Sequence, residues 1–166
     1  TVLRNMGGQI EELDRREVGG EPVADLRVRH SALTGVDVDP ALAPAMIDEF
    51  PVLFVAAAHA QGTTRTTGLE ELRVKESDRL DVMAEALAGI GARGEEAQDG
   101  LIIHGNGGEP LRGSANAPVA THLDHRIAMS MAVAGIAIRD GVEVDDTAPI
   151  NTSFPTFMDL LDGAQS

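Results

Sequence analysis

The chain has 166 residues, a formal net charge of −14 and no cysteine. This length suffices for one domain with a sizeable core. The negative charge argues against binding to a phosphate backbone, and the absence of cysteine excludes disulfides, thiolate catalysis and Cys-ligated zinc. Aromatic residues make up only 2% of the chain, too few for base-stacking platforms. No apolar run of membrane-spanning length and no signal peptide stand out. The sequence therefore predicts a cytoplasmic protein with neither a membrane nor a nucleic acid as its partner.

The first part of the chain is predicted to be mainly extended. Its elements in order are a helix end at Val2–Met6, a strand at Gln9–Leu13, a turn region at Asp14–Glu21, a strand at Ala24–His30 and a short extended piece at Val36–Val38. Gly7 and Gly8 form the stop of the opening helix. Because a chain seldom begins within a helix, we expect Thr1 to be an internal position of a longer protein.

The rest of the chain alternates apolar helices with short β segments. Pro51 opens the first of these helices and Gly62 follows it, and the helix is apolar on nearly all sides, so it should be buried. The predicted elements in order are a helix at Val52–His59, a β segment at Thr63–Thr67, a helix from an N-cap at Ser77 to about Ile90, a hairpin of Arg93–Ala97 and Leu101–His104, a loop at Asn106–Pro118, a helix at Ile127–Ile138, a strand at Val142–Val144 and a last helix opened by Ser153 and Pro155.

The order of these elements repeats along the chain. An Asp, a buried helix, a Gly, a β segment and a second helix begin at Asp48, and the same order begins again at Asp124. The opening helix end matches the end of the helix near Ile90. We therefore predict an α/β fold of repeated βαβα-type units, with two full units and part of a third. Residues 1–166 would form a single lobe.

A charged stretch, Glu71–Leu80, stands immediately before one of the amphipathic helices and contains the only lysine of the chain, Lys75. Arg79 lies in the first turn of that helix, where the helix dipole disfavours a cation. A bound anion would remove this conflict. Arg126 has the same position in the next buried helix, two residues after an Asp. The alternative is local pairing, of Arg79 with Asp78 or Glu76 and of Arg126 with Asp124. Two further arginines, Arg65 and Arg73, would join a basic cluster if the fold brought them near.

Three segments in this order, Met46–Pro51, Glu71–Leu80 and Thr121–Met129, resemble the 5-enolpyruvylshikimate-3-phosphate synthase family. The likeness runs from about Ala24 to the last residues and is closest to the bacterial class known for glyphosate-insensitive members. It implies an enzyme of two lobes, each made of three repeated units around buried parallel helices. This chain would be most of one lobe, and its partner would be the missing N-terminal part.

The resemblance also implies the chemistry. The family transfers the enolpyruvyl group of phosphoenolpyruvate to the 5-hydroxyl of shikimate 3-phosphate by addition and elimination, with release of phosphate and without a metal or other cofactor. By this likeness Asp48 would bind the shikimate hydroxyls and accept the proton, while Glu76 would exchange a proton with the methylene carbon. From the residues alone, without the family, Asp48 is expected to be only the N-cap of the helix opened by Pro51. An ion pair of Glu76 with Lys75 or Arg79 would keep Glu76 ionised.

The same resemblance implies the roles of the cations. Lys75 would contact shikimate 3-phosphate or bridge the two substrates, and Arg79 and Arg126 would bind phosphoenolpyruvate. His125 is a weaker candidate for the same pocket. A lysine that many members carry before the last helix is replaced here by 151–153, so the group that contacts the leaving phosphate is open. Two alternatives remain: UDP-N-acetylglucosamine enolpyruvyl transferase, and a non-catalytic lobe that binds a phosphorylated ligand or a complementary fragment.

Overall fold

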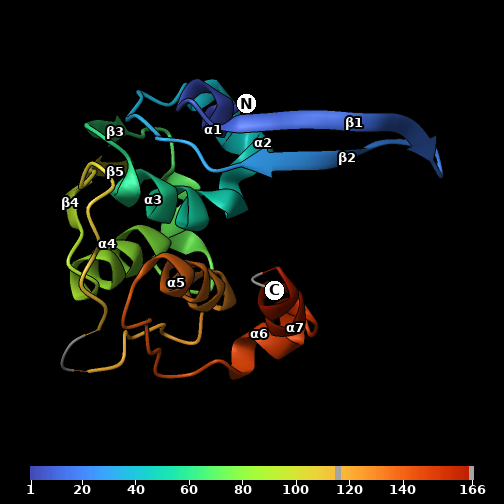
Figure 1. Ribbon diagram of the computed structural model, residues 1–166. Helices are drawn as coiled ribbons and strands as arrows, with labels where there is room; N and C mark the ends of the chain where they lie inside the picture. The colour runs from blue at the N-terminus through green and yellow to red at the C-terminus, as the bar shows by residue number, and fades with distance from the viewer. Residues whose placement is uncertain (115–116, 165–166) are drawn as a thin grey trace.

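The computed structural model describes residues 1–114 and 117–164 of the chain as an α/β fold of short strands and packed helices (Figure 1). In chain order the elements are α1 (Val2–Asn5), β1 (Gln9–Val18), β2 (Glu21–Arg29), η1 (Pro40–Leu42), α2 (Ala43–Met46), η2 (Ile47–Glu49), α3 (Phe50–His59), β3 (Thr63–Arg65), η3 (Glu70–Val74), α4 (Arg79–Gly89), β4 (Arg93–Ala97), β5 (Gly100–His104), α5 (His125–Ala137), α6 (Ala148–Ser153) and α7 (Phe157–Gly163). The predicted α/β class is confirmed.

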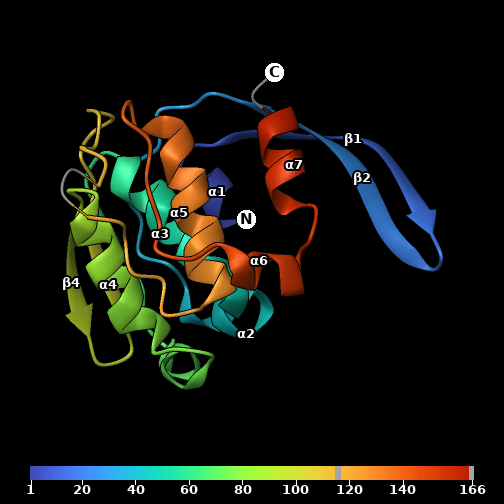
Figure 2. The same cartoon turned by 90° about the horizontal axis from the view of Figure 1, so that it is seen from below.

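Helices α3, α4 and α5 form the centre of the fold and pack against one another (Figures 1 and 2). In α3, Phe50 and Phe54 are almost wholly buried and lie with their rings 5.9 Å apart. Leu80 and Met83 of α4 and Ile127 of α5 are fully buried in the same core. Burying such side chains stabilises the fold by about 1.5–3 kcal/mol each. The helix predicted at Val52–His59 is thus confirmed as a buried one.

A three-stranded antiparallel sheet, in the order β3-β5-β4, lies against α3 and α4. The hairpin of β4 and β5 has the predicted strands, and β3 corresponds to the predicted β segment at Thr63–Thr67. Thr66 anchors the end of β3, because its hydroxyl donates to the Leu101 carbonyl and accepts from the Leu101 amide, both at 2.9 Å. The sheet thereby covers one side of the helical core.

Strands β1 and β2 form a long two-stranded hairpin that projects from the rest of the molecule (Figures 1 and 2). The turn region predicted at Asp14–Glu21 is wrong: β1 continues to Val18, and the turn is confined to Gly19 and Gly20, whose φ values of 63° and 87° suit glycine. Pairs of opposite charge, such as Arg16 with Asp25, link the two strands and allow this charged sequence to stay extended.

The C-terminal third departs from the prediction in two places. Val142–Val144 forms no strand; only Val144 makes an isolated parallel bridge, to Val119. Ser153 ends α6 instead of opening a helix, and α7 starts after the turn that contains Pro155. The second unit of the repeat therefore lacks its β strand.

Two other predicted segments also lack regular secondary structure in their described residues. In the first part of the chain, Val36–Val38 contributes only an isolated bridge, from Asp37 to Arg65. The predicted loop 106–118 has no helix or strand in its described part, and residues 115–116 lie outside the described residues.

By length and composition, the stretch Pro40–His59 is apolar enough to cross a membrane, with a mean hydropathy of 1.6 over its most apolar window. Two charged residues, Asp48 and Glu49, interrupt its apolar residues. The stretch consists of η1, α2, η2 and α3, and most of α3 is buried among the other helices. Its apolar character is that of a core helix.

Candidate active site

Three central helices begin close together, and their first residues build the site. Asp48 lies in η2, directly before α3; Arg79 is the first residue of α4; and Arg126 is the second residue of α5. The N-cap of α4 is Asp78, not Ser77 as predicted, and its carboxylate accepts from the amides of Leu80 and Asp81 at 3.2 Å. The ion pairs described below show that the three helices run away from one common point.

Arg79 lies where the starts of the three helices meet. Its side chain is only 2% exposed, and each nitrogen of the guanidinium contacts a different carboxylate. Nε donates to Asp124 at 2.8 Å, Nη1 to Asp48 at 2.9 Å and Nη2 to Glu76 at 2.5 Å. The three acidic residues come from three separate parts of the chain. Arg79 therefore ties the starts of α3, α4 and α5 together.

Asp48 is the carboxylate on which all three predicted cations converge. Besides the bond from Arg79, it lies 3.8 Å from Lys75 Nζ and 3.8 Å from Arg126 Nη2. It is not the N-cap of α3, because that position is Glu49 and no side chain caps the helix there. One carboxylate thus spans the separation of the three cations, which is the scale of a single small anion.

Lys75 and Arg126 are the cations that solvent can reach, with side chains 24% and 33% exposed. The hydrogen bond to Glu71, 2.5 Å from Nζ, and its charge raise the pKa of Lys75, so this amine stays charged. Arg126 lies 3.4 Å from Glu49 and from the Asp48 carbonyl. Its side chain makes no pair with Asp124, which bonds to its backbone amide instead. The alternative of a local pair therefore fails for Arg126.

Asp124 is completely buried and accepts a hydrogen bond from Arg79 on the inner side of the cluster. Its Oδ2 accepts from Arg79 and, at 2.9 Å, from the Ser77 hydroxyl, while its Oδ1 accepts from the Arg126 amide at 2.9 Å. Burial acts to raise the pKa of Asp124, but the hydrogen bonds and charge of Arg79 outweigh it, together with Ser77, and hold the pKa below its usual range. Asp124 is consequently a negative charge at neutral pH, next to the cluster.

Glu76 forms the ion pair with Arg79 that the sequence offered as the alternative to an acid role. Its side chain is 49% exposed, and His125 Nδ1 lies 3.9 Å from its other oxygen. Glu76 therefore stands at the rim of the cluster, within reach of both a cation and solvent.

Several features were not predicted from the sequence. Arg65 and Arg73 do not join the cluster, because Arg65 pairs with Asp37 and Arg73 pairs with Asp78 and Glu96. Ser77 was expected as a cap and instead supports the Asp124 carboxylate. The only signal for that role was its position two residues before Arg79, which is also typical of a cap.

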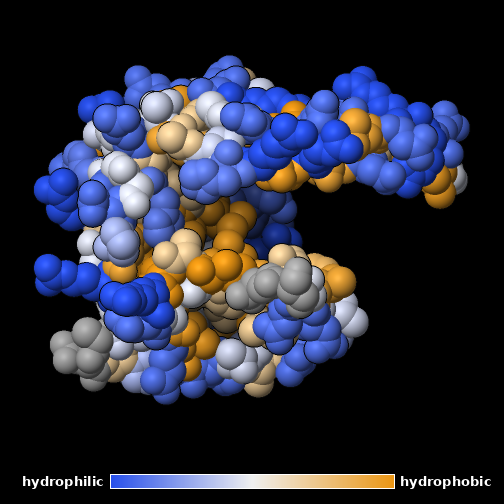
Figure 3. Space-filling model, viewed as in Figure 1, coloured by the Kyte–Doolittle hydropathy of each residue, from blue (hydrophilic) through white to orange (hydrophobic). Residues whose placement is uncertain are grey.

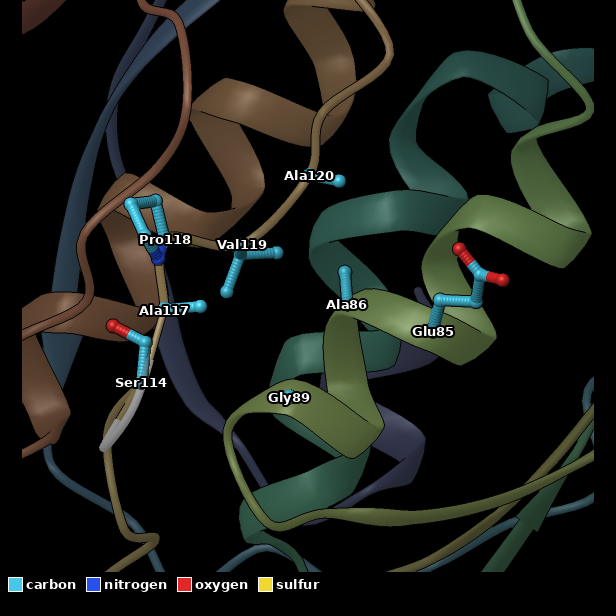
Figure 4. Close-up of a pocket in the computed structure, with 8 residues that line it drawn as sticks. All are labelled: Glu85, Ala86, Gly89, Ser114, Ala117, Pro118, Val119 and Ala120. Carbon is cyan, nitrogen blue, oxygen red and sulfur yellow. The ribbon is translucent and has the colours of Figure 1, made fainter.

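A cavity of about 380 Å³ lies between α4 and the segment that leads to α5 (Figure 4). Its lining residues are Glu85, Ala86, Gly89, Ser114, Ala117, Pro118, Val119 and Ala120. Three of them come from the second half of α4 and the other five from the segment that leads to α5, so the cavity shares no residue with the cluster. In the described residues, no group of three or more His, Asp or Glu side chains is arranged to hold a metal ion.

Comparison with known proteins shows which family the chain resembles. The family model for EPSP synthase (3-phosphoshikimate 1-carboxyvinyltransferase) matches residues 1–161. The chain is 73% identical to the 3-phosphoshikimate 1-carboxyvinyltransferase of Novosphingobium aromaticivorans and 68% identical to that of Sphingopyxis alaskensis, covering 98% and 99% of this chain but 37% and 36% of those proteins. The structure of EPSP synthase from Acinetobacter baumannii superposes with a TM-score of 0.91 at 42% identity, over 98% of this chain and 37% of that one.

The fold places the chain in the enolpyruvyl transferase class of α/β proteins. Within that class, the chain belongs to the EPSP synthase family. It spans little more than a third of the length of the curated relatives it matches.

Proposed function

We propose that this chain supplies part of the active site of an enzyme that transfers the enolpyruvyl group of phosphoenolpyruvate to the 5-hydroxyl of shikimate 3-phosphate, with release of phosphate. The observation that carries the proposal is the convergence of Lys75, Arg79 and Arg126 on one carboxylate at the start of three helices. Helix N-termini and paired arginines are suited to phosphate and carboxylate groups. The family membership of the chain supports the same substrates.

The proposed roles follow the positions of the side chains. Asp48 accepts the proton of the attacking hydroxyl, because it lies at the centre of the cations that would hold the substrates. Glu76, at the exposed rim, exchanges the proton with the methylene carbon. Lys75 and Arg126 contact the substrate anions directly, since solvent reaches them. Arg79 is buried, so it binds an anion only if one of its carboxylate partners withdraws.

The charge balance of the cluster indicates that the site is completed by other residues. Among the described residues, three cations face five carboxylates: Asp48, Glu49, Glu71, Glu76 and Asp124. With all eight groups charged the cluster is negative, and the net charge of the whole chain adds to the repulsion of an anionic substrate. We infer that further cations come from the part of the enzyme outside this chain, and that the isolated chain is inactive.

The surface offers a place for that missing part. One face of the β1–β2 hairpin carries Ile10, Leu26 and Val28, and the last two are 63% and 66% exposed. Figure 3 shows apolar side chains along the underside of the projecting hairpin and in the hollow beside it. A two-stranded hairpin has little stability in water unless its apolar face is covered. We therefore propose that residues 1–166 are most of one lobe of a two-lobed enzyme, and that the remaining chain covers this face.

We also propose that the enzyme acts in the cytoplasm, needs no cofactor, and resembles the glyphosate-insensitive bacterial class. The family membership of the chain supports the first two assignments, and the motifs of the sequence support the third.

A phosphate-release assay tests the proposal. The purified chain is mixed with phosphoenolpyruvate and shikimate 3-phosphate, alone and with the separately expressed remainder of the protein. We expect phosphate release only when both parts and both substrates are present. Turnover with UDP-N-acetylglucosamine instead of shikimate 3-phosphate would assign the other transferase. Binding of phosphoenolpyruvate without any turnover of the reassembled protein would favour a non-catalytic lobe.

A further inference from the structure

Two consecutive residues just before α5 have a backbone conformation that L-residues rarely adopt. His122 and Leu123 have φ values of 52° and 60°. The Asp124 amide donates to the Thr121 carbonyl at 3.0 Å, so the four residues form a tight turn with both central residues left-handed. Such positions normally hold glycine or asparagine, and a γ-branched leucine there is strained. Strain of this kind persists only where the surroundings enforce it.

Asp145 enforces one end of the turn. Its Oδ1 accepts the Thr121 hydroxyl at 2.7 Å, the Thr121 amide at 2.9 Å and the Asp146 amide at 2.8 Å. Two backbone bonds beside it, from the Val119 amide to Glu143 and from the Asp145 amide to Val119, join the same two loops. Thr121 is completely buried, so its hydroxyl has no water to replace Asp145.

Asp124 is the other end of the turn, and it is the residue that holds Arg79. A turn with ordinary φ values would send the chain in another direction from Thr121 and would displace the Asp124 carboxylate. The buried bond from Arg79 Nε to Asp124 therefore depends on the conformation of His122 and Leu123.

We propose that Thr121 and Asp145 are positioning residues of the active site: their clamp holds the strained turn, which places Asp124 and thereby fixes Arg79 at the centre of the cluster formed by Lys75, Arg79, Arg126 and Asp48. Neither residue touches the cluster. This inference rests on the proposed function for the role of Arg79, but the clamp itself has a readout that does not depend on activity.

The chain offers a matched control. Thr66 is 2% exposed and, like Thr121, has a hydroxyl that makes buried hydrogen bonds, to Leu101 of β5. It belongs to the sheet and not to the cluster. Thr66→Val and Thr121→Val therefore remove the same group from similar surroundings, and only the second change should reach Arg79. Thr121→Ser keeps the hydroxyl and tests rescue.

The experiment compares these variants in the complete enzyme. Steady-state kinetics give kcat and KM for phosphoenolpyruvate, and arginine-selective ¹⁵N labelling gives the hydrogen-exchange rate of Arg79 Nε–H, assigned with Arg79→Lys. For Thr121→Val we expect a loss of about ten- to a hundredfold in kcat/KM, because small misplacements of a binding group have effects of that size. The exchange of Arg79 Nε–H should accelerate at least about tenfold, which is the factor for a bond weakened by 1.4 kcal/mol. Thr121→Ser and Thr66→Val should stay within about threefold of the wild type in both, a tolerance of less than 1 kcal/mol. Asp145→Ala should behave as Thr121→Val does.

Each outcome bears on one of the two proposals. If Thr121→Val and Thr66→Val change Arg79 exchange equally, the clamp has no special link to Arg79 and the inference is overturned. If Arg79 exchange accelerates only in Thr121→Val and Asp145→Ala, the clamp is supported even if the wild type shows no turnover with phosphoenolpyruvate. That lack of turnover would refute the proposed function alone.

Discussion

Replacing Asp124 by asparagine removes the buried charge beneath Arg79 while keeping the shape of the side chain. In the wild type, Asp124 accepts three hydrogen bonds, from Arg79, Ser77 and the Arg126 amide. An asparagine has one carbonyl oxygen, so it can accept hydrogen bonds at the place of only one of the two carboxylate oxygens. At the place of the other oxygen, its NH2 group then faces another hydrogen-bond donor.

The magnitude follows from these contacts. If the asparagine oxygen keeps the place of Oδ2, the bond to Arg79 loses its charge on one side, at a cost of about 1–2 kcal/mol. The cap of α5 at the Arg126 amide is lost as well, at about 1 kcal/mol. Arg79 retains Asp48 and Glu76, so the full cost of about 3–5 kcal/mol for breaking a buried pair is not reached. We expect a loss of about 2–3 kcal/mol in the free energy of unfolding.

Urea unfolding at several pH values measures this loss. The pKa of Asp124 is lowered in the folded protein, so its contribution is fully present above the unfolded value of about 3.9 and is lost as the pH falls through the lower folded value. The difference between wild type and Asp124→Asn should therefore be constant from about pH 7 to pH 5 and should shrink below about pH 4.

Asp37→Asn is the control for the same chemical change. Asp37 pairs with Arg65 at 3.5 Å and its side chain is 79% exposed, so its replacement should cost less than about 0.5 kcal/mol. A loss at Asp124 as small as that at Asp37, or a difference between wild type and Asp124→Asn that does not change with pH, would show that the Asp124–Arg79 pair does not stabilise the fold in the way argued.

Three further predictions concern catalysis and packing. In the complete enzyme, Asp48→Asn and Glu76→Gln should each lower the rate of phosphate release by about two to four powers of ten. The thermal unfolding temperature of Glu76→Gln should stay near that of the wild type, because this side chain is half exposed. Full activity of either variant removes that residue from the mechanism. Phe54→Ala should lower the free energy of unfolding, measured in urea, by about 3–5 kcal/mol, since Phe54 is 0% exposed. Val74→Ala is the control: this side chain is 80% exposed, so the loss should be less than about 0.5 kcal/mol. Equal losses would contradict the assigned core. Gly105→Ala should destabilise the fold by at least about 1–3 kcal/mol, because a Cβ there would lie 2.0 Å from the Ala60 carbonyl oxygen. Gly163→Ala, at an open position of α7, should be neutral or stabilising in the same assay. A larger loss for Gly163→Ala than for Gly105→Ala would refute the close approach at Gly105.

The sequence by itself determined the α/β class, the buried helix α3 and the hairpin of β4 and β5. These depend on local patterns: Pro51 near the start of α3, a run that is apolar on all sides, and the Asp99-Gly100 turn signal between two short strands. The same local patterns marked Arg79 and Arg126 as candidates, since a cation in the first turn of a helix can be recognised without any knowledge of its neighbours. Asp48 was marked by the resemblance of Met46–Pro51 to the family.

Local patterns failed where the deciding contact came from far along the chain. Ser77 was expected to cap α4, but its hydroxyl donates to Asp124, 47 positions away, and Asp78 takes the cap. The strands β1 and β2 extend through charged residues because pairs across the hairpin compensate those charges. Val142–Val144 looked like a strand, yet the described residues provide only one bridge for it.

The arrangement of the site itself was decided by the tertiary structure. Only the packing of α3 against α4 and α5 brings Asp48 and Asp124 to the arginine that Glu76, three residues earlier in the chain, also contacts. The sequence could not predict that Arg79 is buried and saturated while Lys75 and Arg126 remain accessible. The free energy of an ion pair depends on the distance between the charges and on their burial. Both are set by the positions at which the helices pack together, and a local pattern of residues does not specify those positions.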